Sequence, residues 1–258
     1  MTFELDLKGR RALITGAGQG VGRGIAHGFA AAGAEVVVND LRLERAQEVV
    51  DEIQGVGGTG RAAPFDVTDY ASVTAAVEAL GGVDILVNNA GNAGAEGFGG
   101  LGPFVDTRPA DWEPFLRVNL YGVLHCAHAV LPGMIAKGWG RIVTISSDSG
   151  RTGEANMAAY SAAKAGAAGL TRALAVETGR HGITVNTIAL GTMRTPATEG
   201  LWSDPENPRA KAMLRRYAVR RPGLPEDAAA LAVFLAGPQA SWITGQTYPL
   251  NGGISFAQ

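Results

Sequence analysis

Near its amino end the chain reads Arg11-Ala-Leu-Ile-Thr-Gly-Ala-Gly-Gln-Gly-Val-Gly-Arg-Gly-Ile25, a short apolar run followed by a cluster of glycines. The apolar run predicts a buried strand over 12–15. A helix is predicted over 20–32, and a second apolar run predicts a strand over 35–39. This order of strand, glycine turn, helix and strand is typical of the first βαβ unit of an α/β sheet.

Three of these glycines, Gly16, Gly20 and Gly22, stand where the chain passes from the strand to the helix. Glycine permits a tight turn and lets a bound group approach the backbone closely. The amino end of the helix adds unpaired N–H groups and a partial positive charge, which suit a diphosphate. The position between a strand and a helix therefore predicts a dinucleotide-binding turn, with an ordinary glycine-rich turn as the alternative.

Asp40 ends the second predicted strand and is the candidate residue for choosing the dinucleotide. A carboxylate there accepts hydrogen bonds from the adenosine ribose hydroxyls and repels a 2′-phosphate, which favours NAD over NADP. Arg23 and Arg42 lie nearby in sequence and offer positive charge to that phosphate, so NADP stays as the alternative. Asp40 is also placed to cap the helix that begins at Leu43, and the two roles are compatible.

Apolar runs that predict strands alternate with helical stretches along the whole chain. The strands are predicted at 12–15, 35–39, 61–65, 83–87, 141–146, 183–188 and 246–250. The helices are predicted at 20–32, 43–54, 69–80, 109–137, 157–180 and 225–236. This alternation predicts the fold class α/β, as a single-domain Rossmann-type doubly wound parallel sheet of about seven strands with helices on both faces, over residues 1–258. Ligands of such a sheet bind beyond the carboxyl ends of its strands.

The composition excludes several classes of function. A net charge of −2 and a pI near 6.1 give no general attraction to nucleic acid. The single cysteine, Cys126, lies in an apolar stretch and is predicted to be in the core. No cluster of histidine, cysteine or acidic residues has metal-ligand spacing, so no metal is predicted. The first strand begins too early for a signal peptide and no apolar run reaches spanning length, which predicts a cytoplasmic protein with no membrane partner.

Tyr160 and Lys164 form the candidate catalytic pair. They stand four residues apart in an alanine-rich stretch that reads as helix, so their side chains share one face. A free tyrosine titrates near pH 10, and an ammonium held beside it favours the phenolate and lowers its pKa. A phenol tuned in this way passes a proton to or from an alcohol oxygen. The alternative is a surface tyrosine beside a solvated lysine.

Together these motifs resemble those of the classical short-chain dehydrogenase/reductase family, and the resemblance covers nearly all of the 258 residues. Thr15-Gly-Ala-x-x-x-Gly-x-Gly22 resembles the family's cofactor motif, and Asn88-Asn-Ala-Gly91 resembles its strand-four motif. Asp66 resembles the acid that meets the adenine, and Thr195 the threonine that meets the nicotinamide amide. The residues implied to bind the cofactor are Gly16, Gln19, Gly20, Val21, Gly22, Asp40, Leu41, Asp66, Val67, Asn89, Ala90, Gly91, Tyr160, Lys164, Thr192 and Thr195.

The resemblance also implies a role for each of four catalytic residues. Tyr160 acts as general base in oxidation and general acid in reduction, while Lys164 lowers its pKa and holds the nicotinamide ribose. Ser147, thirteen residues before the tyrosine, donates to the substrate oxygen. Asn119 holds a water that links Lys164 to solvent.

The chain departs from the family pattern at two places. Leu190-Gly191 replaces the usual Pro-Gly after strand six, and since leucine lacks the fixed φ of proline, the entry to the substrate loop is expected to be less rigid. Asn251-Gly-Gly253 stands where Asp-Gly-Gly is often found near the carboxyl end. Neither change touches the proposed chemistry.

Two irregular segments are expected near the site. The glycine-rich stretch from Gly91 to Pro103 is predicted to be a loop beside the active site or a plain surface loop. The segment 192–221 is predicted to be a lid insertion whose apolar residues either line the substrate pocket or pack a short helix. Its cations either meet an acidic carrier or form a solvated face; they are Arg209, Lys211, Arg215 and Arg216.

The function predicted from these observations is an NAD(P)-dependent short-chain alcohol dehydrogenase or ketoreductase acting on a secondary alcohol or ketone. One alternative is a 3-oxoacyl reductase or 3-hydroxyacyl-CoA dehydrogenase acting on an ACP or CoA thioester. A more remote alternative is a dinucleotide-binding sensor without catalysis. The resemblance further implies a homo-oligomer, commonly a tetramer, with the helices over 109–137 and 157–180 at two-fold interfaces.

Overall fold

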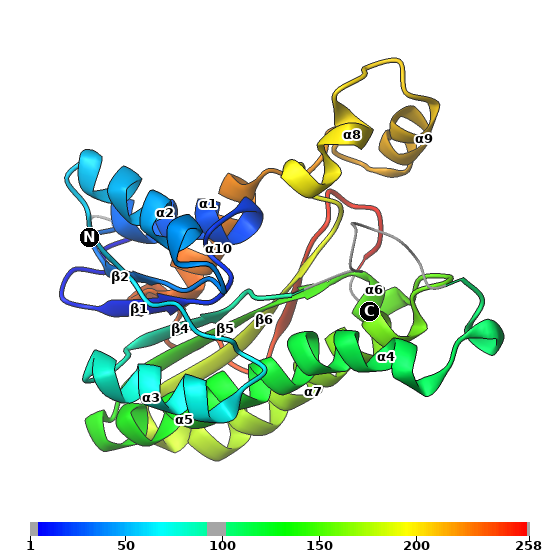
Figure 1. Cartoon of the computed structure of the whole chain (residues 1–258). Coiled ribbons are helices and arrows are strands. Elements are labelled where there is room, and N and C mark those ends of the chain that lie inside the picture. Colours follow the sequence, from blue (N-terminus) through cyan, green and yellow to red (C-terminus); the bar gives the residue numbers. More distant parts are fainter. Residues whose placement is uncertain (1–4, 92–101, 257–258) are drawn as a thin grey trace.

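The computed structural model describes residues 5–91 and 102–256. Its centre is one seven-stranded sheet in the order β3-β2-β1-β4-β5-β6-β7, with every neighbouring pair parallel (Figure 1). The strands are β1 (Arg11–Ile14), β2 (Glu35–Val38), β3 (Thr59–Ala62), β4 (Ile85–Asn88), β5 (Gly140–Ser147), β6 (Ile183–Leu190) and β7 (Thr247–Leu250). The strand order reverses between β1 and β4, so the predicted doubly wound parallel sheet is confirmed.

Helices cover both faces of this sheet (Figure 1). One face carries α1 (Gly20–Ala31), α2 (Leu43–Gly55) and α10 (Pro225–Ala236). The other carries α3 (Tyr70–Leu80), α4 (Pro109–Leu116), α5 (Gly122–Lys137) and α7 (Ala158–Thr178). Successive side chains of a strand alternate between the faces, so Ile14 belongs to the core cluster under α1 and Leu13 to the cluster under α5. Both are fully buried, which explains why the strands read as continuous apolar runs.

The helix predicted over 109–137 is divided in the structure. A five-residue π-helical turn, Arg117–Tyr121, separates α4 from α5. Pro114 lies inside α4 and has no N–H for the helical ladder, and π turns of this kind often occur at functional sites. The sequence pattern carries no signal for the turn, because the apolar periodicity continues across it.

The combined run Pro109–Lys137 is long enough to cross a membrane, and an 18-residue window within it is apolar enough, with a mean hydropathy of 1.3. The expectation that no apolar run reaches spanning length is therefore wrong on length and composition. The helix α5 packs against β4, β5 and α7, and 39% of the apolar window is buried. Core helices that pack on a sheet have the same length and composition, so this run alone does not indicate a membrane span.

Shorter elements surround the carboxyl edge of the sheet. The lid segment contains a 3₁₀ turn (Pro196–Thr198), α8 (Glu199–Trp202) and α9 (Pro208–Arg216), and it projects away from the sheet (Figure 1). A four-residue helix, α6 (Ser149–Thr152), follows β5 and was not predicted. Further 3₁₀ turns occur at Phe104–Asp106, Gly179–His181 and Pro238–Ala240. Most of the loop predicted from Gly91 to Pro103 lies outside the described residues.

Candidate active site

The glycine turn lies between the carboxyl ends of β1 and β4. Gly16 and Gly20 have φ values of +61° and +56°, which only glycine adopts without strain. A Cβ on Gly22 would stand 2.3 Å from Nδ2 of Asn89, and one on Gly16 would stand 2.8 Å from Cα of Ala90. Asn89 donates from Nδ2 to the carbonyl oxygen of Gly16 at 3.0 Å. Backbone conformation or close packing therefore requires glycine at all three positions.

The amino end of α1 has no side-chain cap. Gln19 occupies the N-cap position, and its side chain makes no hydrogen bond to the first turn. The first N–H groups of the helix have no partner within it, which suits an anion such as a phosphate. Thr195 approaches from the lid, with its Cβ 3.6 Å from the position of a Cβ on Gly20, while Val21 packs against the core.

Two polar residues that hold this turn were not predicted as site residues. Thr15 Oγ1 accepts hydrogen bonds from the backbone N–H groups of Asn89 and Ala90, both at 3.0 Å. Asn39 Oδ1 accepts from the N–H of Gly16 at 3.2 Å, and its Nδ2 donates to two carbonyl oxygens after β3. Both residues are buried at the carboxyl ends of apolar strands, and that position is the signal from which they could have been found.

Asp40 faces the glycine turn directly. Its carboxylate is buried, and Oδ2 would stand 2.6 Å from a Cβ on Gly18. Its Oδ1 accepts from the backbone N–H of Arg42 at 3.0 Å, but Arg42 is itself the N-cap position of α2 and no side chain caps that helix. The expected capping role of Asp40 is therefore wrong. Arg23, one of the two cations considered for a 2′-phosphate, is paired with Glu52 at 2.5 Å.

The residues expected around the adenine lie at the same edge. Asp66 follows β3 and accepts through Oδ1 from the N–H of Thr68 at 2.8 Å. Val67 is buried against Gly122, where a Cβ would stand 2.8 Å from its Cγ2. Leu41 is 71% exposed, so its apolar surface is open to a flat ring. The edge thus offers a carboxylate and apolar side chains, as an adenine and its ribose require.

The candidate catalytic residues meet at the end of β5. Ser147 is the last residue of that strand, and its side chain interacts with Tyr160, which is partly buried on α7. The Nζ of Lys164, one helical turn further on, lies 5.7 Å from the centroid of the Tyr160 ring. Lys164 is 5% exposed and donates from Nζ to the carbonyl oxygen of Ile145 at 3.0 Å. The ring of Tyr160 also packs edge-on against Phe115, with 6.4 Å between centroids.

Asn119 joins this group through the π-helical turn. It is fully buried, and its Nδ2 donates to the carbonyl oxygen of Phe115 at 3.0 Å. A Cβ on Gly91 would stand 2.9 Å from Oδ1 of Asn119 and 3.2 Å from Nζ of Lys164. The amide of Asn119, the ammonium of Lys164 and the backbone of Gly91, just after β4, therefore lie close together. A continuous helix over 109–137, as expected from the sequence, gives no indication of this arrangement.

Burial controls the protonation of the pair. It lowers the pKa of Lys164 to about 8. Burial also raises the pKa of Tyr160, a hydrogen bond from Ser147 opposes this rise, and the negative charge of Glu154 adds to it. The expectation that Lys164 lowers the pKa of Tyr160 is therefore not met by the chain alone. The reason is that Lys164 is itself desolvated, while Glu154, which was not considered, acts in the opposite direction.

The exit of β6 is held by hydrogen bonds where proline is missing. Leu190 accepts through its carbonyl oxygen from the N–H of Asp148 at 2.8 Å, and Gly191 donates to the carbonyl oxygen of Leu250 at 3.0 Å. The next residue, Thr192, donates from its N–H to Oη of Tyr217 at 3.1 Å. The looser loop entry expected from Leu190 is therefore offset by contacts to β5, β7 and the lid.

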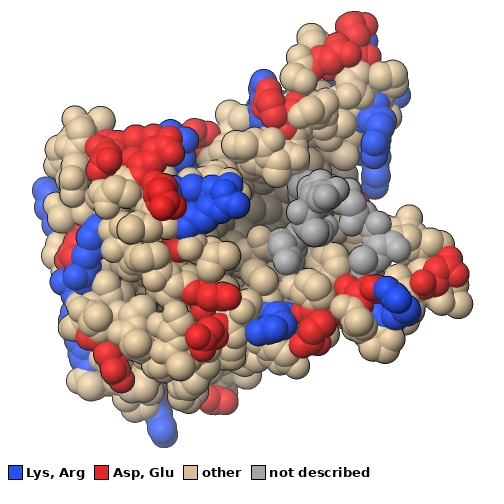
Figure 2. Space-filling view, viewed as in Figure 1, with Lys and Arg blue, Asp and Glu red and all other residues tan. Residues whose placement is uncertain are grey.

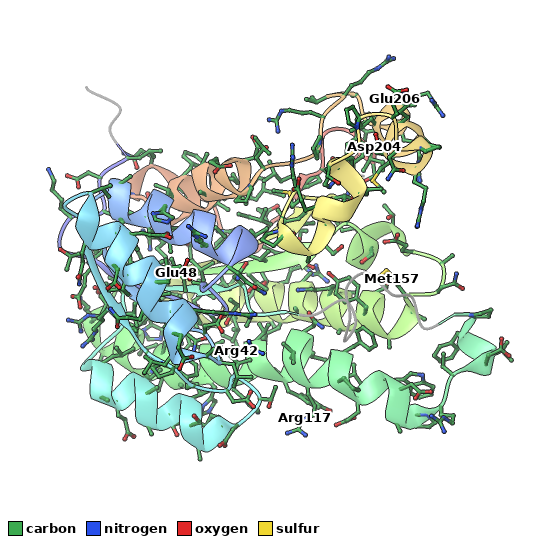
Figure 3. All side chains as sticks on the ribbon, turned by 45° about the horizontal axis from the view of Figure 1, so that its top comes forward. Arg42, Glu48, Arg117, Met157, Asp204 and Glu206 are labelled. Atoms are coloured by element: carbon green, nitrogen blue, oxygen red, sulfur yellow. The ribbon has the colours of Figure 1, made fainter. Side chains whose placement is uncertain are left out.

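The lid combines internal packing with exposed charge, and a hollow separates it from the body of the molecule (Figure 2). Trp202 and Tyr217 are buried, which favours the alternative that the apolar residues of the lid pack its own short helices. Acidic side chains share the segment with the cations, including Asp204 and Glu206 (Figure 3). Lys211 pairs with Glu206 at 2.6 Å. The other three cations of the predicted carrier-binding face are exposed; they are Arg209, Arg215 and Arg216.

The single cysteine and the histidines lie outside this site. Cys126 is fully buried in the core, as predicted, and burial raises its pKa to about 12, which keeps the thiol protonated. Two helical histidines are engaged at the surface, His27 with Glu52 and His128 with Tyr70. Within residues 5–91 and 102–256, no group of three or more histidine, cysteine or acidic side chains could hold a metal ion.

The chain is similar to known proteins over nearly its whole length. The family model that matches residues 16–255 is described as enoyl-(acyl carrier protein) reductase. A 7α-hydroxysteroid dehydrogenase from Escherichia coli (strain K12) is 40% identical over 253 residues, which cover 96% of this chain and 95% of that protein.

Two solved structures are similar over nearly their whole length. A 7α-hydroxysteroid dehydrogenase complexed with NADH and 7-oxo glycochenodeoxycholic acid superposes with a TM-score of 0.88 at 40% identity, covering 97% of this chain and 96% of that one. A gluconate 5-dehydrogenase from Burkholderia cenocepacia J2315 in complex with NADP and tartrate has a TM-score of 0.90 at 34% identity, covering 99% and 98%.

Proposed function

The chain belongs to the short-chain dehydrogenase/reductase family, and from that premise we propose that it moves hydride between a nicotinamide dinucleotide and the carbinol or carbonyl carbon of a secondary alcohol or ketone. The observation that carries the proposal is the meeting of Ser147, Tyr160 and Lys164 at the end of β5, at the same edge of the sheet as the glycine turn. The phenol of Tyr160 can exchange a proton with the substrate oxygen, and the hydroxyl of Ser147 can donate a hydrogen bond to it, while the carbon that carries this oxygen exchanges hydride with the dinucleotide.

Each polar side chain has a separate task in this mechanism. In oxidation the phenolate of Tyr160 takes the proton of the substrate hydroxyl as its carbon loses hydride, and in reduction the phenol returns that proton. Ser147 donates a hydrogen bond to the same oxygen and stabilises the negative charge that grows there. Lys164 lies close to both the phenol and Asn119. Its ammonium would hold the ribose hydroxyls of a bound dinucleotide, and the amide of Asn119 would hold a water that connects the lysine to solvent.

The residues present fit a nicotinamide dinucleotide. The uncapped end of α1 and the glycine cradle, which any Cβ on Gly22 would fill, suit the diphosphate, and Asp40 suits the ribose hydroxyls of NAD. The dinucleotide would supply the hydride-carrying carbon. NAD is proposed over NADP because the Asp40 carboxylate faces the turn while Arg23 is committed to Glu52. Similar proteins with either NADH or NADP bound exist, so this preference has to be measured.

A direct assay tests the proposed function. The purified protein is incubated with NADH or NADPH and a panel of ketones, including a 7-oxosteroid and keto-sugar acids, and with NAD or NADP and the matching alcohols. We expect carbonyl-dependent loss of nicotinamide absorbance, faster with NADH than with NADPH. Tight NADH binding with no turnover on any carbonyl would instead favour a dinucleotide-binding sensor, and the activity proposed here would be wrong.

The second candidate function is reduction of a 3-oxoacyl thioester. It is favoured by the exposed lid cations Arg209, Arg215 and Arg216 and by the acyl-carrier description of the matching family model. The acidic side chains on the same lid, such as Glu206, argue for a mixed solvated face. Rates measured on one 3-oxoacyl group as the free acid and as its thioester separate the two, because equal rates would remove the role of the cations.

The same premise extends to assembly and location. We propose one catalytic domain over residues 1–258, acting in the cytoplasm as a homo-oligomer, either a dimer or a tetramer. Tyr121, the last residue of the π-helical turn, and Leu124 of α5 are exposed apolar side chains on a run that is only partly buried, and a second copy of the chain would cover them. Light scattering on the purified protein measures the subunit number.

A further inference from the structure

The hydroxyl of Ser147 is surrounded in a way that fixes the direction of its proton. Ser149, two residues further on, is 5% exposed and lies at the start of α6. Its backbone N–H donates to Oγ of Ser147 at 3.3 Å, and its own hydroxyl donates to the same oxygen at 3.0 Å. A hydroxyl has one proton and two acceptor sites, so Ser149 fills both acceptor sites. The proton of Ser147 is thereby left to be donated outward.

The contact between Ser147 and Tyr160 agrees with that direction. The contact with Ser147 lowers the pKa of the phenol, and a serine that donates its proton has this effect because it stabilises the phenolate. The substrate oxygen proposed above lies next to the same phenolic group, so the outward proton serves both.

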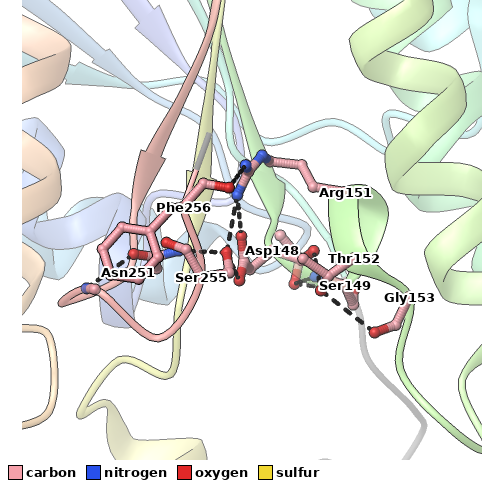
Figure 4. Close-up of polar contacts among 10 residues, drawn as sticks. Asp148, Ser149, Arg151, Thr152, Gly153, Asn251, Ser255 and Phe256 are labelled. Atoms are coloured by element: carbon pink, nitrogen blue, oxygen red, sulfur yellow. Dashed lines mark hydrogen bonds and ion pairs between the residues drawn. The ribbon is translucent and has the colours of Figure 1, made fainter. Parts of the chain in front are cut away.

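Ser149 is held in place by a polar clamp between α6 and the carboxyl-terminal segment (Figure 4). We define this clamp as Asp148, Arg151 and Ser255. Asp148 accepts from Nη1 of Arg151 at 2.5 Å and from Oγ of Ser255 at 2.7 Å, a contact across 107 residues of sequence. Arg151 also donates to Oγ of Ser255 at 3.1 Å, and Asn251 donates to the same oxygen at 2.9 Å. The ion pair is mostly shielded, with side-chain exposures of 17% and 13%, so water weakens it less than a surface pair.

A second attachment holds the turn from the other side. The backbone N–H of Asp148 donates to the carbonyl oxygen of Leu190 at 2.8 Å, at the exit of β6. The residue between the catalytic serine and Ser149 is therefore bound to both β6 and the chain terminus. Such a double attachment leaves the turn little freedom to rotate away from Ser147.

We propose that Ser149, held by the clamp, is a positioning residue that keeps the hydroxyl of Ser147 as a hydrogen-bond donor to the reacting oxygen. This proposal rests on the function proposed above. Without the Ser149 hydroxyl, one acceptor site of Ser147 is free and its proton can turn toward other partners. Misplacement of a catalytic group by about 1 Å costs up to ~10²-fold in rate, and because the backbone N–H contact remains, a loss of about tenfold in kcat is expected.

The kinetic test uses Ser149→Ala with Ser241→Ala as the matched control, since Ser241 is an exposed serine outside the site. We expect Ser149→Ala to lower kcat about tenfold with little change in the KM for NADH, and the control to keep wild-type kinetics. In a Ser147→Ala background the same substitution should change kcat less than about twofold, because its effect passes through Ser147. A full tenfold loss in that background would overturn the proposal.

Loosening the clamp gives a milder second variant in case Ser149→Ala does not fold. Ser255→Ala leaves Ser149 intact and removes one hydrogen bond to Asp148. It should lower kcat a few-fold and again have no effect in the Ser147→Ala background. An unchanged kcat in Ser255→Ala would contradict the part of the proposal that assigns support to the clamp.

A titration separates this proposal from the proposed function. The phenolate absorbance of Tyr160 is obtained by subtracting the Tyr160→Phe protein from each variant, since the chain has five tyrosines. Among the described residues, two charged groups face this phenol, Lys164 from α7 and Glu154 from the preceding turn, and both are unchanged in Ser149→Ala. The pKa of Tyr160 should rise in Ser149→Ala and in Ser147→Ala, with no further rise in the double variant. An unchanged pKa in Ser149→Ala refutes the positioning role, even if no carbonyl is ever reduced.

Discussion

Replacing Lys164 with methionine should stabilise the fold at neutral pH while removing activity. Burial lowers the pKa of this lysine from 10.5 to about 8. Each pKa unit corresponds to about 1.4 kcal/mol, so keeping the ammonium in its buried position costs the native state about 3 kcal/mol below pH 8. Methionine fills a similar volume without charge but loses the hydrogen bond to Ile145, worth about 1 kcal/mol. The net expectation at pH 7 is a gain of about 2 kcal/mol in the free energy of unfolding.

The gain should depend on pH in a definite direction. The unfolded wild-type chain keeps its lysine proton up to pH 10.5, while the native chain releases it near pH 8. Between these values the unfolded state holds more protons, so the stability of the wild type rises with pH. The variant lacks this rise, and its advantage should shrink from pH 8 upward and reverse by about 1 kcal/mol near pH 10.5.

Urea unfolding of both proteins at pH 7 and pH 10, at equal protein concentration, measures this difference. Lys211→Met is the control, because it removes an exposed lid lysine and should show no such pH-dependent difference. A Lys164→Met protein that is less stable than the wild type by the same amount at both pH values would refute the reasoning. In that case the buried ammonium would be stabilised by contacts that outweigh its desolvation.

Three further substitutions test other parts of the site. Asp40→Ser should lower the preference for NAD by removing the carboxylate that repels a 2′-phosphate, and a preference unchanged in paired kcat/KM measurements would contradict that role. Gly22→Ala should unfold at lower urea and bind NADH more weakly, because its Cβ would stand 2.3 Å from Asn89 Nδ2; wild-type calorimetric affinity would be the contrary result. Glu154→Gln should shift the acid limb of the pH profile for oxidation to lower pH, since removing the negative charge lowers the pKa of Tyr160; a limb that stays in place would exclude this influence.

The fold could be predicted because its determinants are local. Strands buried on both faces read as apolar runs, and the glycine turn at Gly16, Gly20 and Gly22 is required by backbone conformation and close approach. The strand predicted over 61–65 ends earlier, at Ala62, and Pro64 follows, which has no N–H for the ladder. This error is small, since it concerns only the boundaries of the strand.

The features that could not be predicted depend on contacts between distant parts of the chain. The π-helical turn that holds Asn119 has no periodicity of its own, and the clamp joins Asp148 to Ser255 across 107 residues. The direction of the Tyr160 pKa shift depends on how deeply the phenol is buried and on where Glu154 lies. Sequence spacing places a lysine beside a tyrosine, but only the fold determines how much water each retains.

The measurement closest to the proposed chemistry is single-turnover hydride transfer in Tyr160→Phe. This variant keeps the ring that packs on Phe115 and deletes only the hydroxyl. We expect NADH to bind with wild-type affinity while the rate of carbonyl reduction falls by about 10²–10⁴. A phenylalanine variant that reduces the same ketone at the wild-type rate would contradict the assignment of the proton transfer to Tyr160, and with it the proposed mechanism.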